Sequence, residues 1–293
     1  MDRKFGLKFG ETLTVDEMLK AICVVSANDC SVAMAEYISG SEEIFVQKMN
    51  EKAVELGMND TTFKNCHGID EDGHVTSSYD ISLMSMELLN KYPEIINYTT
   101  IWTDTLRDGE SELVNTNKLI RTYEGATGLK TGSTSLALYN LSASATRDNL
   151  SLIAVVMKAP SSDERLSCAK TLLDYGFANY EFLTTSTENE VVQNVAVAKG
   201  IDDNVNLVYE TTTGTIVTKG NSENITSEIT IVENITAPIN QGDVLGEVCF
   251  YVNDELVGTT NLIAETDVKK MSSINMFEHI TNIWSNLLRQ NTG

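Results

Sequence analysis

The feature that most limits the fold of this chain is the segment LSLIAVVM at residues 150–157, which is apolar except for one serine. Such a segment predicts a central strand that other elements cover on both faces. A strand-like segment at residues 139–146 ends one short turn before residue 150, so the two segments are expected to pair as antiparallel neighbours. Apolar residues at helical spacing in 161–180 then predict an amphipathic helix on the same sheet.

The chain before these strands is predicted to be mainly helical. Thr14 with Glu17 three residues later is typical of a capping box and predicts a helix from residue 15. Further helical repeats follow up to residue 56 and again after Ser77, and the alternating, Thr-rich residues 98–115 predict a hairpin. Helices followed by an antiparallel sheet with a terminal helix predict an α+β domain.

The composition changes near residue 180. Residues 189–267 are rich in Val, Ile and Thr in short runs, separated by Gly, Asn and Asp at intervals of roughly 8 to 12 residues. This pattern predicts a small all-β module, a sandwich or a barrel. Residues 268–293 then place apolar side chains at helical spacing. That amphipathic segment can pack on the β module or lie in the plane of a membrane surface, and we expect the membrane.

Charge and cysteine usage exclude several classes of function. The formal net charge is -21, which opposes binding of nucleic acid because that binding depends on clustered Lys and Arg. The five cysteines are scattered without a C-x-x-C pair, and the three histidines lack paired ligand spacing, so neither a metal nor another cofactor is expected. No segment has the length of a membrane span, and the N-terminus lacks the apolar region of a signal peptide.

Two polar sites interrupt predicted buried elements. Ser26-Ala27-Asn28 lies between two apolar helical patterns, where Ser26 either caps the second helix or faces a cleft as a proton relay, with Asn28 holding an amide. Lys130-Thr131-Gly132 offers a cation, a hydroxyl and an unobstructed backbone to an anionic ligand, or is simply a strand entering a turn.

The loop with His67 and Gly68 has a similar ambiguity. His67 can act as a base, although anchoring of the loop is its more common use. The acidic run Asp70-Glu71-Asp72 lacks the alternating ligands of a calcium loop.

Taken together, the Ser-x-Asn at residue 26, the HGID loop at residue 67, the Lys-Thr-Gly at residue 130 and the order of elements resemble the serine-type D-alanyl-D-alanine carboxypeptidases. These low-molecular-mass penicillin-binding proteins remove the terminal D-Ala from peptidoglycan stem peptides. The resemblance implies an acyl-enzyme mechanism in which Ser-x-x-Lys, Ser-x-Asn and Lys-Thr-Gly meet at one cleft. It also implies a location on the outer face of the bacterial cytoplasmic membrane and, in the intact parent, binding of β-lactams.

By this resemblance, each matching residue receives a role. Ser26 relays a proton, Asn28 binds the substrate amide and Lys130 supplies electrostatic stabilisation. Thr131 binds the substrate carboxylate with help from Arg165, whose guanidinium can form paired hydrogen bonds with a carboxylate. Gly132 and Ser133, like Lys130, also belong to the substrate-binding residues. Two positions depart from the family pattern, because Ser133 replaces a His of several relatives and Leu138 a frequent Gly.

The nucleophile motif is the larger departure. The only Ser-x-x-Lys string is Ser167-Cys168-Ala169-Lys170, which follows Lys-Thr-Gly instead of preceding Ser-x-Asn. We therefore expect that the nucleophile segment of the parent is missing and that this polypeptide alone is inactive.

The predicted organisation is an incomplete penicillin-binding/β-lactamase-like domain at 1–182, an all-β domain at 183–267 and a membrane-associating helix at 268–293. Two alternatives remain open. One is a non-catalytic peptidoglycan-binding or scaffold protein, and the other is a relative of the serine β-lactamases or transpeptidases.

Overall fold

The computed structural model describes residues 4–220, 225–272 and 281. The chain divides into two compact units, residues 1–179 and 180–293, and each has a hydrophobic core of its own. No helix in the described part of the chain is long and apolar enough to cross a membrane. The segment predicted to be a terminal amphipathic helix lies, from residue 273 onward and apart from Thr281, outside the described residues.

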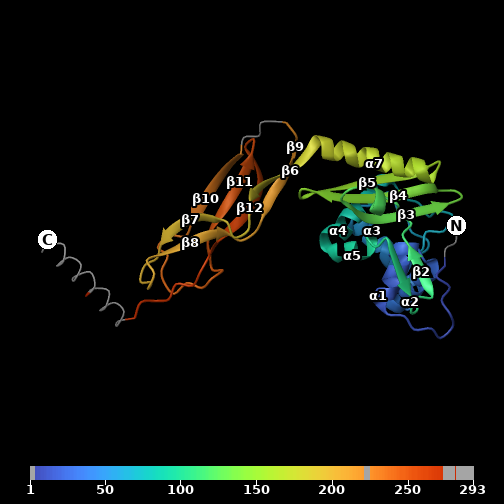
Figure 1. Cartoon of the computed structure of the whole chain (residues 1–293), viewed down its shortest axis with the longest axis horizontal. Coiled ribbons are helices and arrows are strands. Elements are labelled where there is room, and N and C mark those ends of the chain that lie inside the picture. The colour runs from blue at the N-terminus through green and yellow to red at the C-terminus, as the bar shows by residue number, and fades with distance from the viewer. Residues whose placement is uncertain (1–3, 221–224, 273–280, 282–293) are drawn as a thin grey trace. The chain divides into compact units, whose positions relative to one another are not determined.

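The first unit is a three-stranded antiparallel sheet, ordered β3-β4-β5, with helices on both faces. Figure 1 shows α7 along one face of the sheet, and α3, α4 and α5 on the other side. The elements are α1 (Val15–Lys20), the π-helical turn η1 (Ala21–Val25), α2 (Asn28–Ser39), α3 (Glu42–Glu55), α4 (Ser78–Lys91), the 3-10 turn η2 (Pro93–Ile95), α5 (Ile96–Thr99), β1 (Thr103–Leu106), β2 (Ser111–Val114), α6 (Leu119–Thr122), β3 (Ala126–Thr134), β4 (Leu138–Arg147), β5 (Leu150–Ala159) and α7 (Ser162–Asn179).

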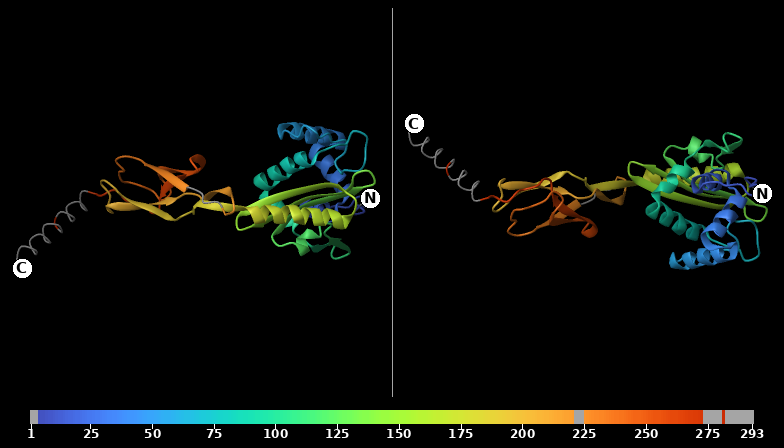
Figure 2. Two further views of the ribbon diagram at one scale, coloured as in Figure 1. Left: turned by 90° about the horizontal axis from the view of Figure 1, so that it is seen from above. Right: turned by 90° about the horizontal axis from the view of Figure 1, so that it is seen from below.

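The apolar strand β5 differs from its prediction in one respect. It packs against α7 and α4, so the predicted cover on both faces is confirmed (Figure 2). Its central position is wrong within the described residues, because β5 pairs only with β4 and is the outer strand of the sheet. Side-chain polarity reports what covers the faces of a strand, whereas pairing along its edges uses the backbone and leaves little trace in the sequence.

The N-terminal elements match the predicted start. Thr14 caps α1 in a complete capping box with Glu17, as expected. Met18, Ala21 and Val24 then form part of a buried cluster beneath the β1–β2 hairpin, to which Leu106 and Leu113 also belong. The hairpin turns at Asp108-Gly109, as predicted.

The extended segment before α1 is held by Asp29 in the first turn of α2. The two carboxylate oxygens of Asp29 accept backbone N–H groups from Phe5, Gly6 and Leu7 at 2.8 to 3.0 Å and from Cys30 at 3.0 Å. Burial alone would raise the pKa of Asp29, but these four donors favour the ionised form and hold the pKa below its ordinary value. The charge of Asp29 therefore stabilises the folded N-terminal segment.

The second unit is an all-β module. A five-stranded antiparallel sheet has the order β10-β11-β12-β8-β7, and a separate two-stranded sheet pairs β6 with β9. Its core is built from inward-facing residues such as Leu207, Val248 and Leu262, each almost fully buried. The strands are β6 (Tyr180–Ser186), β7 (Val191–Ala196), β8 (Asn204–Tyr209), β9 (Thr213–Thr218), β10 (Ile225–Ile231), β11 (Val244–Val252) and β12 (Glu255–Ala264).

Replacing Asp29 tests how strongly the N-terminal segment is held. Because Asp29→Ala leaves three N–H groups of that segment without their acceptor, we expect the first unit to lose about 1 to 3 kcal/mol of stability at pH 7. A carboxylate whose pKa is lower in the folded than in the unfolded chain stabilises the fold at pH values above its unfolded pKa. This stabilisation is lost as the pH falls through the lower, folded pKa. The difference from wild type should therefore shrink below about pH 4.

The measurement is urea unfolding followed by Trp102 fluorescence in a Trp284→Phe background. Asp108→Asn, in the turn of the hairpin, is the matched loss of a carboxylate and should change stability little. Equal effects of the two variants at pH 7 would contradict the role of Asp29.

Candidate active site

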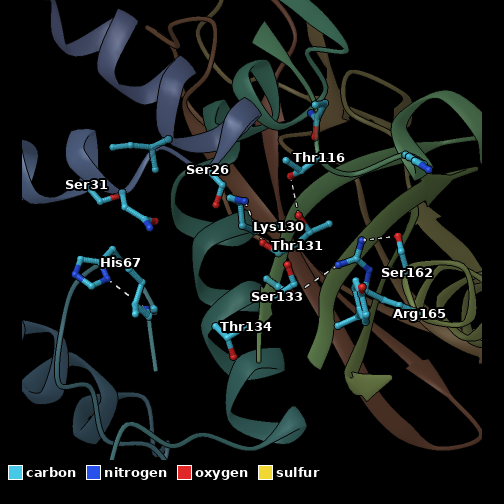
Figure 3. A pocket seen from close by; sticks show the side chains of 18 of the residues that line it. Ser26, Ser31, His67, Thr116, Lys130, Thr131, Ser133, Thr134, Ser162 and Arg165 are labelled. Atoms are coloured by element: carbon cyan, nitrogen blue, oxygen red, sulfur yellow. Dashed lines mark hydrogen bonds between the residues drawn. The ribbon is translucent and has the colours of Figure 1, made fainter. Parts of the chain in front are cut away.

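The residues of the Ser-x-Asn and Lys-Thr-Gly motifs surround one cavity of about 750 Å³ in the first unit. It lies between η1, the start of α2, the loop around His67, strand β3 and the start of α7 (Figure 3). All seven residues singled out for a site line it, namely Ser26, Asn28, Lys130, Thr131, Gly132, Ser133 and Arg165.

Ser26 lies at the end of an irregular helix. After α1 the chain makes the π-helical turn η1, and Ser26 closes it in a left-handed conformation, with φ 64°. A π turn in a helix and a left-handed non-glycine residue both concentrate at functional sites, because regular structure would avoid them. Ala27, not Ser26, occupies the N-cap position of α2, and the N-cap residue makes no side-chain capping hydrogen bond. The capping alternative is therefore wrong, and Ser26 faces the cavity.

The Lys-Thr-Gly motif lies on β3, the outer strand of the sheet next to the cavity. Lys130 donates to the carbonyl of Thr131 at 3.1 Å, and the hydroxyl of Thr131 donates to that of Thr116 at 2.7 Å. A Cβ atom added to Gly132 would meet no protein atom closer than Asn140 Cβ at 4.0 Å. The packing of the protein does not require a glycine there, so the open backbone is available to a ligand.

The loop Asn115-Thr116-Asn117 after β2 also shapes the site, and the sequence analysis missed it. The buried amide of Asn117 donates to the carbonyl of Gly128 on β3 at 2.9 Å, and the N–H of Thr116 donates to Val24 of η1 at 3.1 Å. This loop therefore joins the helix that ends at Ser26 to the strand that carries Lys130. Two asparagines in series before a short helix were the available sequence signal.

Arg165 lies in the first turn of α7 with an exposed fraction of only 6%. Its guanidinium donates to the carbonyl of Asn140 at 3.2 Å, to that of Gly132 at 3.5 Å and to the hydroxyl of Ser162 at 3.3 Å. Arg165 thus joins α7 to β3 and β4 beside Gly132 and places a positive charge at the wall of the cavity.

The loop with His67 forms the opposite wall. His67 Nδ1 accepts the N–H of Ile69 at 3.3 Å, and its Nε2 lies 3.7 Å from a carboxylate oxygen of Glu42. Asp70 accepts the hydroxyl of Ser135 at 3.2 Å and the N–H of Leu136 at 3.3 Å, so the loop is joined to the β3–β4 turn. These contacts support an anchoring role for His67.

The thiols of Cys66 and Cys23 are not activated for nucleophilic attack. Cys66 lines the cavity, but burial and a hydrogen bond to Glu42 raise the pKa of its thiol to about 12. Burial likewise raises the pKa of Cys23. Since the thiolate is the reactive form, these thiols are poor nucleophiles at neutral pH.

The Ser167–Lys170 string lies away from the cavity. It is in the middle of α7, where Lys170 donates to the carbonyl of Thr122 at 3.2 Å, and neither residue belongs to the lining. Nor do the described residues contain a group of three or more His, Cys, Asp or Glu side chains that could hold a metal ion.

Comparison with known proteins agrees with this geometry. Residues 3–161 match the family model described as D-alanyl-D-alanine carboxypeptidase, and residues 180–270 match that of the C-terminal domain of penicillin-binding protein 5. The D-alanyl-D-alanine carboxypeptidase DacF of Bacillus subtilis is 41% identical over 95% of this chain and 72% of its own length. DacC of Escherichia coli is 30% identical over 90% of this chain and 66% of its own length.

Two solved structures extend the comparison. Penicillin-binding protein 5 from Haemophilus influenzae superimposes with a TM-score of 0.64 at 30% identity, covering 92% of this chain and 78% of that one. Penicillin-binding protein D2 from Listeria monocytogenes in its ampicillin-bound form has a TM-score of 0.55 at 30% identity, covering 60% and 73%.

The chain belongs to the D-alanyl-D-alanine carboxypeptidase family, peptidase family S11, and carries the C-terminal domain of penicillin-binding protein 5. The predicted family and the predicted α+β fold with a C-terminal β domain are confirmed. The family consists of serine-type peptidases that act in peptidoglycan maturation, which implies an extracytoplasmic location.

Two glycines of β3 provide a matched pair of variants. Gly132→Ala adds a methyl group that meets no protein atom closer than 4.0 Å and should change stability by less than about 0.5 kcal/mol. At Gly128, where φ is 153°, an added Cβ would lie 2.8 Å from Thr99 Oγ1, so Gly128→Ala should cost roughly 1 to 3 kcal/mol. Thermal unfolding of the two variants measures this difference, and an equal loss of stability would show that Gly132 is required by the fold.

Proposed function

We propose that the cavity of this chain binds the D-Ala-D-Ala end of a peptidoglycan stem peptide, as the substrate-holding part of a serine-type D-Ala-D-Ala carboxypeptidase. The observation that carries the proposal is the meeting of Ser26, Asn28 and Lys130 at one cavity. In this proposal residues 1–182 belong to the catalytic domain and residues 183–267 to the β domain.

The charges of the cavity fit such a ligand. Lys118, Lys130 and Arg165 line it, although the chain as a whole carries a net charge of -21. A peptide that lies along the outer edge of β3 can form backbone hydrogen bonds as an added strand. Its terminal carboxylate then lies near Thr131, Ser133 and Arg165, while Asn28 holds an amide from the other side and Ser26 relays a proton beside Lys130.

We further propose that this polypeptide alone does not complete the reaction. Family catalysis needs a serine with a lysine three residues later, and the only such string here lies on α7 away from the cavity. Binding without the nucleophile would make this chain a peptidoglycan-binding protein. The HGID loop and the β domain favour the carboxypeptidase class over the β-lactamases and transpeptidases.

Binding and turnover can be measured separately. We expect a peptide ending in D-Ala-D-Ala to bind in calorimetric titration, and Lys130→Ala to weaken binding about tenfold or more, since a charged hydrogen bond contributes about 1.5 to 3 kcal/mol. We expect no release of D-Ala and no covalent adduct after exposure to penicillin. Intact-mass spectrometry that shows a stable one-to-one adduct would overturn the proposed inactivity.

The control for binding is Lys118→Ala, which removes a charge from the same cavity but leaves the Lys-Thr-Gly motif intact. A similar loss of affinity in both variants would indicate general electrostatic attraction instead of recognition by the motif.

Membrane attachment is a separate part of the proposal. The sequence of residues 268–293 places apolar side chains at helical spacing, with polar residues between them. It includes Trp284, which suits a membrane interface. We expect the full chain to float with anionic liposomes and a variant that ends at residue 272 to remain at the bottom of the gradient. The variant keeps Val268, which belongs to the buried core of the β module. Equal flotation of the full chain and the truncated variant would contradict a C-terminal anchor.

A further inference from the structure

A separate cavity of about 290 Å³ lies between α3, the loop after α3, and α4. Among the described residues, its lining shares no member with that of the proposed D-Ala-D-Ala site. An apolar cavity of roughly 150 Å³ is large enough to bind benzene, so this one has room for a longer apolar group. Its apolar walls include Phe45, Met49 and Ala53 on α3, Met58 and Phe63 in the loop, and Met84 on α4.

Hydrogen bonds from residues outside the lining hold the walls of this cavity in place. The side chain of Asn50 on α3 donates to the carbonyl of Phe63 at 2.9 Å and accepts its N–H at 2.8 Å. The buried carboxylate of Asp80 on α4 accepts the N–H of Asp60 at 2.9 Å and the hydroxyl of Thr61 at 2.6 Å. The loop is therefore fixed to both helices by polar contacts, and the space between the walls does not depend on apolar packing.

The polar side chains of the lining are two lysines, Lys48 and Lys52, one helical turn apart on α3. Among the described residues, the lining includes no carboxylate, hydroxyl or amide side chain. Lys52 is paired with Glu55 at 2.8 Å and with Glu87 at 3.1 Å. Lys48 is exposed and has no hydrogen bond or ion pair within the part of the chain that the structure describes. Its ammonium group is therefore available to an anion at the edge of the cavity.

We propose that this cavity binds a fatty acid, that is, a single alkyl chain with a carboxylate head group. The alkyl chain would contact the side chains of Met49, Met58 and Met84, whose flexible thioethers adapt to the shape of a ligand. The carboxylate would pair with Lys48, because the stem of a lysine can lie along an apolar wall while its ammonium group stays in water. This ligand class is additional to the proposed D-Ala-D-Ala peptide, and the inference does not rest on that function.

Calorimetric titration of the full chain with soluble amphiphiles tests both parts of the ligand. We expect decanoate to bind about tenfold tighter than octanoate, since each buried methylene strengthens binding about fourfold. Decanol has the same chain length as decanoate but no charge. Because ion pairs of exposed lysines are weak, we expect decanol to bind about two- to fivefold more weakly than decanoate. Lys48→Gln should remove this difference and leave the affinity for decanol unchanged.

Lys64→Gln is the matched control, since Lys64 is an exposed lysine of the loop after α3 outside the lining and should preserve the preference for decanoate. The position of the ligand is measured by NMR of methionine methyl groups labelled with carbon-13. Decanoate should shift the signals of Met49, Met58 and Met84 and leave that of Met18, which belongs to the core cluster beneath the hairpin.

Two results would overturn the proposal. Unshifted signals of the three lining methionines, or equal affinities for octanoate and decanoate, would show that the cavity does not take an alkyl chain. Equal affinities for decanoate and decanol, or a preference for decanoate that persists in Lys48→Gln, would show that Lys48 does not recognise a carboxylate there.

Discussion

The arrangement of the site depends on the buried amides of Asn115 and Asn117. Asn115 donates to the carbonyls of Thr99 and Ile101 and accepts the N–H of Asn117, which in turn donates to Gly128 of β3. A buried amide that lost such partners would carry a desolvation penalty of about 1 to 3 kcal/mol. The position of the loop is therefore well determined. Because Thr116 lies between the two asparagines, it reaches η1 with its backbone and the Lys-Thr-Gly motif with its hydroxyl.

This connection explains how helices and a sheet from distant parts of the chain form one cavity. Ser26 belongs to the helical part, Lys130 to the sheet and Arg165 to the helix that covers the opposite face of that sheet. Arg165 is fixed by contacts to the backbone of β3 and β4, and Lys130 by its contact to the carbonyl of Thr131, so these two charges are oriented before a ligand arrives. Preorganisation of this kind reduces the entropy that binding would otherwise cost.

The sequence predicted the parts of this arrangement that depend on local pattern. The capping box at Thr14, the hairpin at Asp108-Gly109 and the strand with Lys130 follow from residue types a few positions apart. The outer position of β5 could not be predicted, because strand pairing is a property of the backbone. The interpretation of Ser26 stayed open for a similar reason, since a π-helical turn has no distinctive composition. Thr116 was missed because its importance comes only from long-range contacts.

The π-helical turn before Ser26 also has a consequence for variation in this family of sequences. The turn accommodates one residue more than a regular helix over the same rise, and this extra residue rotates the next part of the chain by about 100°. Deleting one residue from η1 would restore a regular helix and turn Ser26 away from the cavity. The cavity-lining residues outside η1 would all still be present. In this segment natural selection should therefore tolerate exchanges among apolar residues more readily than any change in the number of residues.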